Sequence, residues 1–404
     1  MMDEDKLFTL ALGLVPPWMV DDVTFKLEEK RLELHINFPK GSRLACPVCG
    51  QECPVHDTVE QKWRHMDFFQ HETYLHARVP RVKCLEHGVR KVEVPWARPG
   101  SHFTLLFEGL LMTLIKHMPV KTVADLVGEH DTRLWRVVEH YVNEARASVD
   151  MSTVRNVGLD ETSNRRGHDY ITLFVDLEAQ RLLFATPGKD AKTVEAFAAD
   201  LVAHGGDPKA IEEVSMDLSP AFQKGAAEHL PKAQITFDRF HLTALVNVAV
   251  DAVRRAEVHE QPDLKKTRWI WLKNASNLKP KQQKQLDALK DRNLKTAFAY
   301  QLRLTFQEIF TLTDRHQGAT LLKGWIDLAK ESALPPLVKV AYTMQNHWDG
   351  ILRWFESHLS NGTLEGFNSL LQSAKSRARG YRTHKNFINM AYLVLGKLDL
   401  KLPT

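Results

Sequence analysis

The chain contains a short apolar run, Val157 to Leu159, that ends abruptly on the carboxylate of Asp160. A second run, Val214 to Met216, ends in the same way on Asp217. Short apolar runs bounded by polar residues are typical of buried strands. We therefore expect a fold that brings two buried strands, each ended by an acid, into one sheet.

Residues 154–238 predict further elements around those two runs. The expected order is strand, strand, strand, helix, strand, helix, strand, over Val157–Asp160, Tyr170–Asp176, Arg181–Thr186, Thr193–His204, Ile211–Asp217, Pro220–His229 and Gln234–Asp238. The second and third strands would form an antiparallel pair. A crossover helix followed by strand–helix pairs predicts a mixed sheet with helices on its faces. The ribonuclease-H-like fold has this order of elements.

A third acid, Glu365, lies in the run Thr363 to Asn368 and opens an amphipathic helix. Two strand-end aspartates and one helical glutamate suit a pair of Mg²⁺ or Mn²⁺ ions, because these ions bind oxygen ligands. Two such ions activate the attacking oxygen and stabilise the leaving oxygen in phosphodiester cleavage and strand transfer. The pattern therefore predicts Asp160, Asp217 and Glu365 as catalytic, magnesium-binding residues.

Asp238, in the run Phe237 to His241, competes with Asp217 for the second position. We favour Asp217 because it ends the strand that follows the first crossover helix. Asp238 and His241 would then support the site from nearby. Glu161 is left out, because side chains alternate across a strand and its carboxylate would face away from that of Asp160.

The flanking segments have different periods. Residues 242–340 carry only helical patterns, broken at Pro262, Pro280 and Pro335, and this all-helical block would lie between the last strand and the helix bearing Glu365. Helical structure is also expected over residues 337–357, 363–375 and 387–398. Residues 6–40 alternate apolar and polar positions instead, which predicts a β-hairpin.

Two short motifs, Cys46 to Gly50 and Cys84 to Gly88, predict a zinc site. Each presents two ligands from one tight turn, and tetrahedral zinc takes four nitrogen or sulfur ligands. The predicted ligands are Cys46, Cys49, Cys84 and His87. Protein fills all four positions, so the ion would be structural. Cys53 and His56, which also lie three apart, are an alternative to the second motif.

Pro95 to Gly100 predicts a linker by its proline and glycine content. Residues 120–139 then predict a short helix, a turn at Gly128 and a second helix, which is a helix-turn-helix pattern. The second helix would offer Arg133 and Arg136 to a DNA groove. An ordinary helical hairpin is the alternative.

Charge is unevenly distributed along the chain. The net charge is only +4, but residues 252–300 carry twelve Lys/Arg against five Asp/Glu, and residues 372–386 carry no acid. The bases of the second block are Lys375, Arg377, Arg379, Arg382 and Lys385. Such blocks fit the phosphate backbone of nucleic acid. No apolar run is long enough to cross a bilayer and the N-terminus is acidic, so a cytoplasmic protein is expected.

These segments resemble the DDE transposases of bacterial insertion sequences, and most closely the ISL-three family. The resemblance covers residues 43–395. Its segments are Cys46–Gly50, Cys84–Gly88, Gly158–Thr162, Met216–Ser219, Asp238–His241, Arg268–Lys273, Ser360–Asn368 and Ala378–Arg382. It implies catalysis at Asp160, Asp217 and Glu365, with Asn368 in support. Cys84-x2-His87 stands where a second Cys-x2-Cys is commonest in the family, and histidine is an acceptable zinc ligand.

The expected fold is a multidomain α+β chain. A β-rich zinc module (1–95) and a helix-turn-helix (100–150) precede a ribonuclease-H-like catalytic domain (154–241 and 341–404), which an α-helical insertion (242–340) interrupts. The expected function is binding of double-stranded DNA at terminal inverted repeats, metal-dependent cleavage and transfer to target DNA, by a homodimer at the bacterial nucleoid. A non-catalytic DNA-binding regulator and a metal-dependent nuclease of the same fold are the alternatives.

Overall fold

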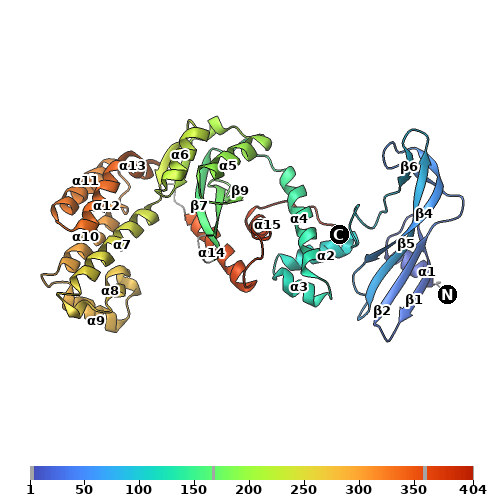
Figure 1. The fold of residues 1–404 in the computed structure, drawn as a ribbon, viewed down its shortest axis with the longest axis horizontal. Helices are drawn as coiled ribbons and strands as arrows, with labels where there is room; N and C mark the ends of the chain where they lie inside the picture. Colours follow the sequence, from blue (N-terminus) through green and yellow to red (C-terminus); the bar gives the residue numbers. More distant parts are fainter. Residues whose placement is uncertain (1–3, 166–168, 358–361, 404) are drawn as a thin grey trace. The chain divides into compact units, whose positions relative to one another are not determined.

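The computed structural model describes residues 4–165, 169–357 and 362–403 (Figure 1). The chain forms two compact units, Met1–Ala145 with Asp399–Thr404, and Arg146–Leu398. Each unit has its own sheet. In the described part of the chain, no helix is both long and apolar enough to span a membrane.

A six-stranded sheet, in the order β1-β2-β5-β4-β3 with β6 on β5, dominates the first unit. Its elements are α1 (Glu4–Ala11), β1 (Met19–Lys26), β2 (Arg31–Asn37), β3 (Arg43–Ala45), β4 (Glu52–Arg64), β5 (Glu72–Cys84) and β6 (Gly88–Lys91). The predicted hairpin is present as the antiparallel pair β1–β2. The prediction is wrong for the start of the segment, where α1 is helical. Phe8 and Leu12, four residues apart, both pack into the core around Trp18.

Three helices follow in the same unit, α2 (Leu105–Ile115), α3 (Val120–Leu126) and α4 (Asp131–Ala147). The α3–α4 pair has its turn at Gly128, where the backbone φ is +70°. The buried Arg64 guanidinium, from the end of β4, donates to the Val127 carbonyl at this turn (3.5 Å). The turn between the two helices is thereby tied to the sheet.

The second unit holds a five-stranded sheet in the order β11-β10-β7-β8-β9. Its strands are β7 (Asn156–Arg165), β8 (Asp169–Asp176), β9 (Arg181–Pro187), β10 (Glu213–Met216) and β11 (Gln234–Phe237). The predicted antiparallel pair is present as β8–β9, and β10 runs parallel to both β7 and β11. The sheet is thus mixed, as expected.

Helices cover both faces of this sheet (Figure 1). Two of them, α5 (Ala191–Ala203) and α6 (Pro220–His229), belong to the same core cluster as Leu159 of β7. Two others, α14 (Gly362–Arg377) and α15 (His384–Leu395), contact the sheet through Leu364 near Gly158 and through the Tyr392 hydroxyl, which accepts from the Ala185 amide (3.0 Å).

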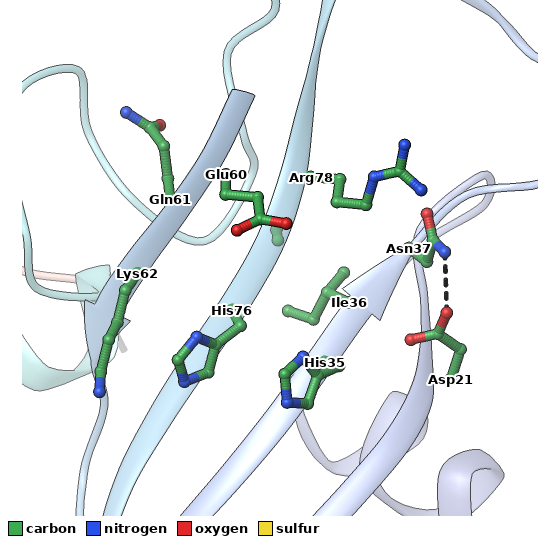
Figure 2. A pocket seen from close by; sticks show the side chains of 10 residues that line it. Asp21, His35, Ile36, Asn37, Glu60, Gln61, Lys62, His76 and Arg78 are labelled. Carbon is green, nitrogen blue, oxygen red and sulfur yellow. Dashed lines mark hydrogen bonds between the residues drawn. The ribbon is translucent and has the colours of Figure 1, made fainter. Parts of the chain in front are cut away.

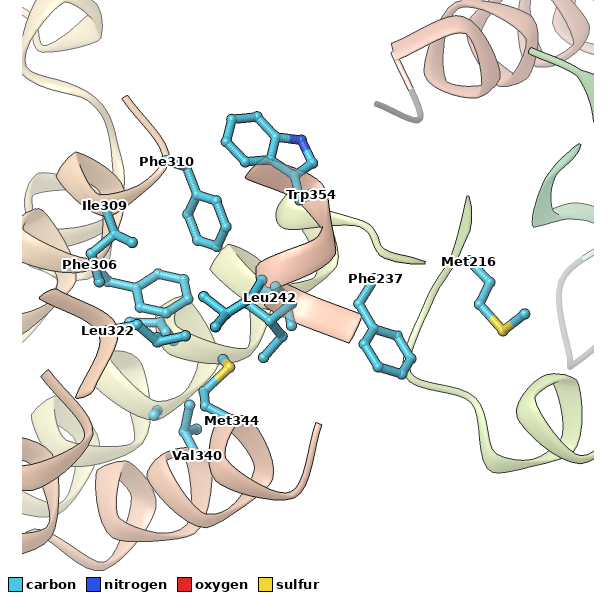
Figure 3. Packing of buried hydrophobic residues seen from close by; sticks show 14 of the residues in the cluster. Met216, Phe237, Leu242, Phe306, Ile309, Phe310, Leu322, Val340, Met344 and Trp354 are labelled. Carbon is cyan, nitrogen blue, oxygen red and sulfur yellow. The ribbon is translucent and has the colours of Figure 1, made fainter. Parts of the chain in front are cut away.

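Between β11 and α14 the described residues form only helices and turns. The helices are α7 (Arg239–Glu257), α8 (Arg268–Leu272), α9 (Pro280–Leu289), α10 (Lys295–Ile309), α11 (Arg315–Glu331), α12 (Pro335–Asn346) and α13 (Trp348–Ser357). Short 3-10 turns lie in this segment at Pro262–Leu264 and Ala275–Asn277, and another lies before β10 at Pro208–Ala210. One core cluster runs from the sheet into these helices, including Phe237, Leu242, Phe306 and Trp354 (Figure 3). The helical segment therefore shares a core with the sheet.

Candidate functional site

Three aspartates lie at one level on three adjacent strands. Ser215 of β10 pairs with Gly158 of β7, so Asp217, two residues on, is level with Asp160. Met216 pairs with Phe237 of β11, so Asp217 is also level with Asp238. In-register residues of parallel neighbours share a face, and the carboxyl ends of these strands meet at one edge of the sheet.

One expectation about Asp160 is wrong, because it does not end its strand. The strand β7 continues to Arg165, where it still pairs with Asp169 of β8, whereas β10 ends at Met216. Asp160 therefore lies at the point where β10 leaves β7. The polar residues after it are accommodated because β8 remains hydrogen-bonded to β7 on its other side.

The helix α14 approaches β7 directly beside Asp160. A Cβ atom on Gly158 would lie 2.7 Å from Leu364 Cδ1, so a larger residue here would force the Leu364 side chain of α14 to shift. Glu365, the next residue, lies in the first turn of α14. One turn later Asn368 Nδ2 donates to Asp160 Oδ2 (2.7 Å). Ser360 and Asn361, which begin the family-like run around Glu365, lie outside the described residues.

His241 lies between two of the acids. Its Nε2 is 3.8 Å from Asp160 Oδ1 and 3.8 Å from Asp238 Oδ2. Asp238 is only 2% exposed and caps α7, because its Oδ1 accepts from the Phe240 amide (3.1 Å). Asp217 Oδ1 accepts from the Ser219 amide (2.9 Å). The supporting residues expected from the sequence therefore surround the acids.

Burial and neighbouring charges raise the pKa of Asp160, Asp238 and Glu365. Burial is the largest cause of the raised pKa of Asp160, and the charges of Asp217 and Asp238 add to it. Burial likewise raises the pKa of Asp238 and of Glu365, with further contributions from Glu365 on Asp238 and from Asp160 on Glu365. The site therefore gathers several acids in a partly buried place, where His241 and Arg239 act against the rise in pKa.

Glu161 is a fifth acid at this edge of the sheet. Burial raises the pKa of its carboxyl, the Lys189 charge lowers it, and the charges of Asp217 and Asp160 raise it. Its position on β7 is adjacent to Asp160, where the alternation of side chains directs it to the opposite face.

A row of polar residues on α14 contacts β7 beyond Asp160. Gln372 Nε2 donates to Thr162 Oγ1 (2.8 Å) and to the Ser163 carbonyl (3.1 Å). Lys375 Nζ donates to the same carbonyl, and burial lowers the pKa of its ammonium group. Gln372 was not among the site residues predicted from the sequence. The spacing of residues 365, 368, 372 and 375 could have indicated it, because that spacing places all four on one helix face.

The remaining bases of the predicted DNA-binding block, Arg377, Arg379, Arg382 and Lys385, have exposed side chains. In the helix-turn-helix, Arg136 is exposed. Arg133 is instead engaged locally, because it pairs with Glu129 and lies over the Phe103 ring, 4.4 Å from its centroid. Of the two arginines predicted to reach DNA, Arg136 is the more accessible.

The four predicted zinc ligands converge in the first unit. The ligand atoms of Cys46, Cys49, Cys84 and His87 all lie within 4.8 Å of one another. Cys49 Sγ is 3.7 Å from Cys84 Sγ, which is 3.6 Å from His87 Nδ1. Within residues 4–165, 169–357 and 362–403, this is the only group of three or more His, Cys, Asp or Glu that meets so closely, so the acids around Asp160 do not.

The two motifs that carry these ligands have the same backbone feature. Each ends on a glycine in the left-handed region, Gly50 with φ +73° and Gly88 with φ +69°. The His87 backbone N–H lowers the pKa of the Cys84 thiol to about 7, which favours the thiolate that zinc binds. This Cys/His cluster fits a structural zinc ion.

The alternative ligands Cys53 and His56 are not part of that cluster. Both belong to β4, and the Cys53 thiol donates to the Gln51 carbonyl (3.3 Å). Cys53 is buried beside Leu44 and Val82, where it acts as a small apolar residue.

A cavity of about 340 Å³ lies on the sheet of the first unit (Figure 2). The rings of His35 and His76 stack along one wall, 4.8 Å apart, and Asn37 donates to Asp21 across it (2.8 Å). None of the catalytic, zinc-binding or DNA-binding residues predicted from the sequence lines it.

Comparison with known families agrees with the geometry of the second unit. Residues 157–391 match the family model described as a transposase of the ISL3 type. The chain belongs to the ISL3 family of transposases. Residues 92–142 match the helix-turn-helix domain of the same family, and residues 42–87 match the zinc finger of its transposases. The predicted order of zinc module, helix-turn-helix and transposase domain is confirmed.

The similar proteins are transposases, and the similarity covers most of each chain. The transposase for insertion sequence element IS1557 of Mycobacterium tuberculosis is 26% identical, over 98% of this chain and 97% of its own. The transposase for insertion sequence element IS1001 of Bordetella parapertussis is 26% identical, over 86% of this chain and 88% of its own. The membership in the ISL3 family thus extends through nearly the whole chain.

Proposed function

We propose that this ISL3 transposase binds the terminal inverted repeats of its insertion sequence, cleaves at the element ends and joins them to target DNA. Asp160, Asp217 and Glu365 are the proposed catalytic residues. The observation that carries the proposal is the convergence of two strands and one helix. Asp160 is level with Asp217, and Glu365 lies in the first turn of α14, next to the Leu364 that packs on Gly158 and close enough to Asp160 for that charge to raise its pKa. Carboxylates on rigid neighbouring elements are suited to hold metal ions for phosphoryl transfer.

The donor set fits two Mg²⁺ or Mn²⁺ ions, held by Asp160, Asp217 and Glu365. Carboxylate oxygens favour such hard cations. Burial is the largest cause of the raised pKa of Asp160 and Glu365, and the charges of neighbouring acids add to it. Among the residues that the structure describes, none donates a hydrogen bond to the buried Asn368 Oδ1, so the residue that holds Asp160 also offers an acceptor. When bound, the ions would activate the attacking oxygen and stabilise the leaving oxygen. Asn368 would hold the Asp160 carboxylate in place.

We assign the second position to Asp217 rather than Asp238. Asp217 is on the middle strand, flanked by both other aspartates. One oxygen of Asp238 is committed to capping α7, and the other lies beside His241. Asp238 and His241 would therefore orient groups at the site from its edge.

The strand order β11-β10-β7-β8-β9 supports a ribonuclease-H-like catalytic domain, with antiparallel first strands and parallel later ones. The helical segment between β11 and α14 supports an insertion into that domain. We accordingly retain the division into residues 1–95, 100–150, 154–241, 242–340 and 341–404.

DNA would be bound by several parts of the chain. The exposed bases Arg377, Arg379, Arg382 and Lys385 would contact phosphates, and Arg136 would reach base edges from the recognition helix. One structural zinc ion, on Cys46, Cys49, Cys84 and His87, would hold the first unit's strands in place. Two copies would pair the two ends in a synaptic complex, acting on nucleoid DNA in the cytoplasm.

The experiment is an end-cleavage and joining assay with Asp160→Ala, Asp217→Ala and Glu365→Ala, each made singly. Each variant should lose activity yet bind end DNA about as well as the wild type. Glu161→Ala is the matched acid control and should remain active. Wild-type activity should require Mg²⁺ or Mn²⁺, whereas Ca²⁺ should support binding only.

Other outcomes separate the alternatives. Full cleavage by all three variants would remove the proposed mechanism. Specific binding with no cleavage by the wild type would indicate a regulator, and cleavage independent of the repeats would indicate a nuclease.

A further inference from the structure

The short helix α8 carries two tryptophans with opposite environments. Trp271 is fully buried, stacks edge-on with Tyr300 and donates from its indole Nε1 to Thr267 Oγ1 (3.1 Å). Trp269, two residues earlier, is 55% exposed. The core of the helical segment therefore uses one of these rings and leaves the other on the surface. A single exposed ring is ordinary by itself, so what surrounds Trp269 decides whether it binds a partner.

The surroundings of Trp269 are cationic. The Arg268 guanidinium lies over its ring, 5.0 Å from the centroid. Three guanidinium groups, those of Arg254, Arg255 and Arg268, gather around the single carboxylate of Asp251, and the last two are more than half exposed. The preceding Lys265 and Lys266 are also exposed.

The nearby acids do not offset this charge. Asp263 pairs with Arg292, and Glu260 pairs with Lys295. Glu257 is buried, where it accepts from Thr296. The surface around Trp269 is therefore complementary to an anionic partner.

We propose that Trp269, with Lys265, Lys266, Arg255 and Arg268, binds unpaired nucleotides of the transposon DNA. The cations would contact phosphates and the indole would stack on a base, which is how surfaces for single strands combine charge with aromatic rings. In duplex DNA the base faces are covered by their neighbours, so an exposed indole adds little there. This proposal rests on the proposed DNA cleavage at the element end.

The surface around Trp269 is separated from the acid cluster by part of the length of α7. The helix α7 begins beside Asp238 in the acid cluster, and the segment that carries Trp269 meets it at Asp251, where Arg268 Nε lies 3.5 Å from Asp251 Oδ2. The two aspartates are thirteen positions apart, which is about 20 Å at 1.5 Å per residue. That length corresponds to about six nucleotides of a DNA strand. A strand lying along α7 would therefore meet Trp269 some way from the phosphate at the acids.

The test is fluorescence anisotropy of the full chain with three end DNAs: a blunt duplex, the same duplex with a single-stranded tail, and that tail made of abasic nucleotides. The wild type should prefer the normal tail to the abasic tail. Trp269→Ala should erase this preference, lowering affinity for the normal tail roughly tenfold. It should leave blunt-duplex binding within about twofold, because the phosphate contacts remain. Trp269→Phe should keep most of the preference.

The matched control is Phe298→Ala, which removes another exposed aromatic ring of the helical segment. Its tail preference should equal that of the wild type. The proposal is overturned if Trp269→Ala retains the preference, if Phe298→Ala loses it equally, or if the wild type binds both tails alike. These outcomes leave end cleavage by the wild type unaffected. Loss of the proposed function would instead appear as a wild type that cleaves no end DNA while still preferring the normal tail.

Discussion

The zinc cluster of the first unit and the acid cluster of the second each consist of four side chains, but they differ in how closely those side chains approach one another. Cys46, Cys49, Cys84 and His87 bring their ligand atoms within 4.8 Å of one another. The acids at Asp160, Asp217, Asp238 and Glu365 share one edge of a sheet without meeting so closely. Burial, with the charges of neighbouring acids, raises the pKa of Asp160, Asp238 and Glu365. We call the zinc cluster closed because its ligand atoms meet one another, and the acid cluster open because its carboxylates do not.

The difference follows from how each set is positioned. Two tight turns present the Cys/His ligands to each other, and a structural metal is satisfied by protein alone. The acids come from three strands and a helix, and their closest support, Asn368 and His241, orients them without neutralising them. An open anionic site keeps room for ions that also bind a substrate phosphate. Metal should therefore matter to folding at the first site and to chemistry at the second.

The largest expected effect is on the closed cluster. Cys84→Ser should release about one zinc per chain and unfold the surrounding strands, because a structural zinc contributes roughly 10 kcal/mol or more to such modules. Metal analysis and limited proteolysis of the first unit would measure both. Cys53→Ser, at a buried cysteine outside the cluster, should keep its zinc. Loss of zinc from Cys53→Ser alone would show that the ligand set is different.

The next effect sharpens the choice within the open cluster. Asp217→Ala should lower the rate of end cleavage roughly a thousandfold, since a metal supplies several kcal/mol of transition-state stabilisation. Asp238→Ala should lower it less, because this residue would act through His241 and the α7 cap. Rates measured over a range of Mg²⁺ concentrations would decide. An active Asp217 variant beside an inactive Asp238 variant would move the second position to Asp238.

Much of this comparison was predictable from sequence, but not all of it. Local patterns gave the zinc motifs, the strand–helix order and the acid at the end of β10, because each depends on neighbouring residues. The helix at Glu4–Ala11 was missed because the alternation of the strands after it was extended to it, although its own apolar residues Leu7, Phe8, Leu10 and Ala11 have a helical spacing. The continuation of β7 past Asp160 depends on pairing with β8, which is a long-range contact.

The face of α14 illustrates the same limit for single residues. Lys375 belongs to a basic block by sequence, yet its ammonium group donates to Ser163 of β7. Whether the Lys375 ammonium group points into solvent or donates to a carbonyl of β7 depends on how α14 packs against the sheet. Arg133 likewise fits a recognition helix by position and is paired with Glu129 in the fold.

That packing yields a prediction of intermediate size. Lys375→Ala should slow cleavage by up to about a hundredfold, because a shift of α14 by about 1 Å would misplace Glu365. Its DNA affinity should keep the wild-type dependence on salt. Arg377→Ala with Arg379→Ala should do the reverse, lowering the salt slope by roughly one to two units while end-sequence preference is retained. A Lys375 variant that changes only the salt slope would return this residue to the DNA-binding block.

The smallest effect concerns the stability of the open cluster without metal. The folded state raises the pKa of Asp238, so this carboxyl binds its proton more tightly in the folded than in the unfolded chain. Its stabilising contribution is present below the unfolded pKa and is lost as the pH rises through the folded pKa. At neutral pH the buried charge therefore opposes folding. Asp238→Asn removes the charge, and asparagine caps a helix as well as aspartate does.

Metal-free Asp238→Asn should consequently unfold about 2 °C above the wild type at neutral pH. The difference should shrink as the pH falls toward the range where Asp238 is protonated. Added Mg²⁺ should raise the wild-type melting temperature, because the ion binds only the folded state. The difference in melting temperature between the wild type and Asp238→Asn should therefore become smaller. Asp327→Asn, at an exposed acid of α11, should change neither value. If Mg²⁺ leaves the wild type unchanged while Asp238→Asn is still stabilised, the acids repel one another without forming a metal site, and the contrast with the zinc cluster would be one of charge alone.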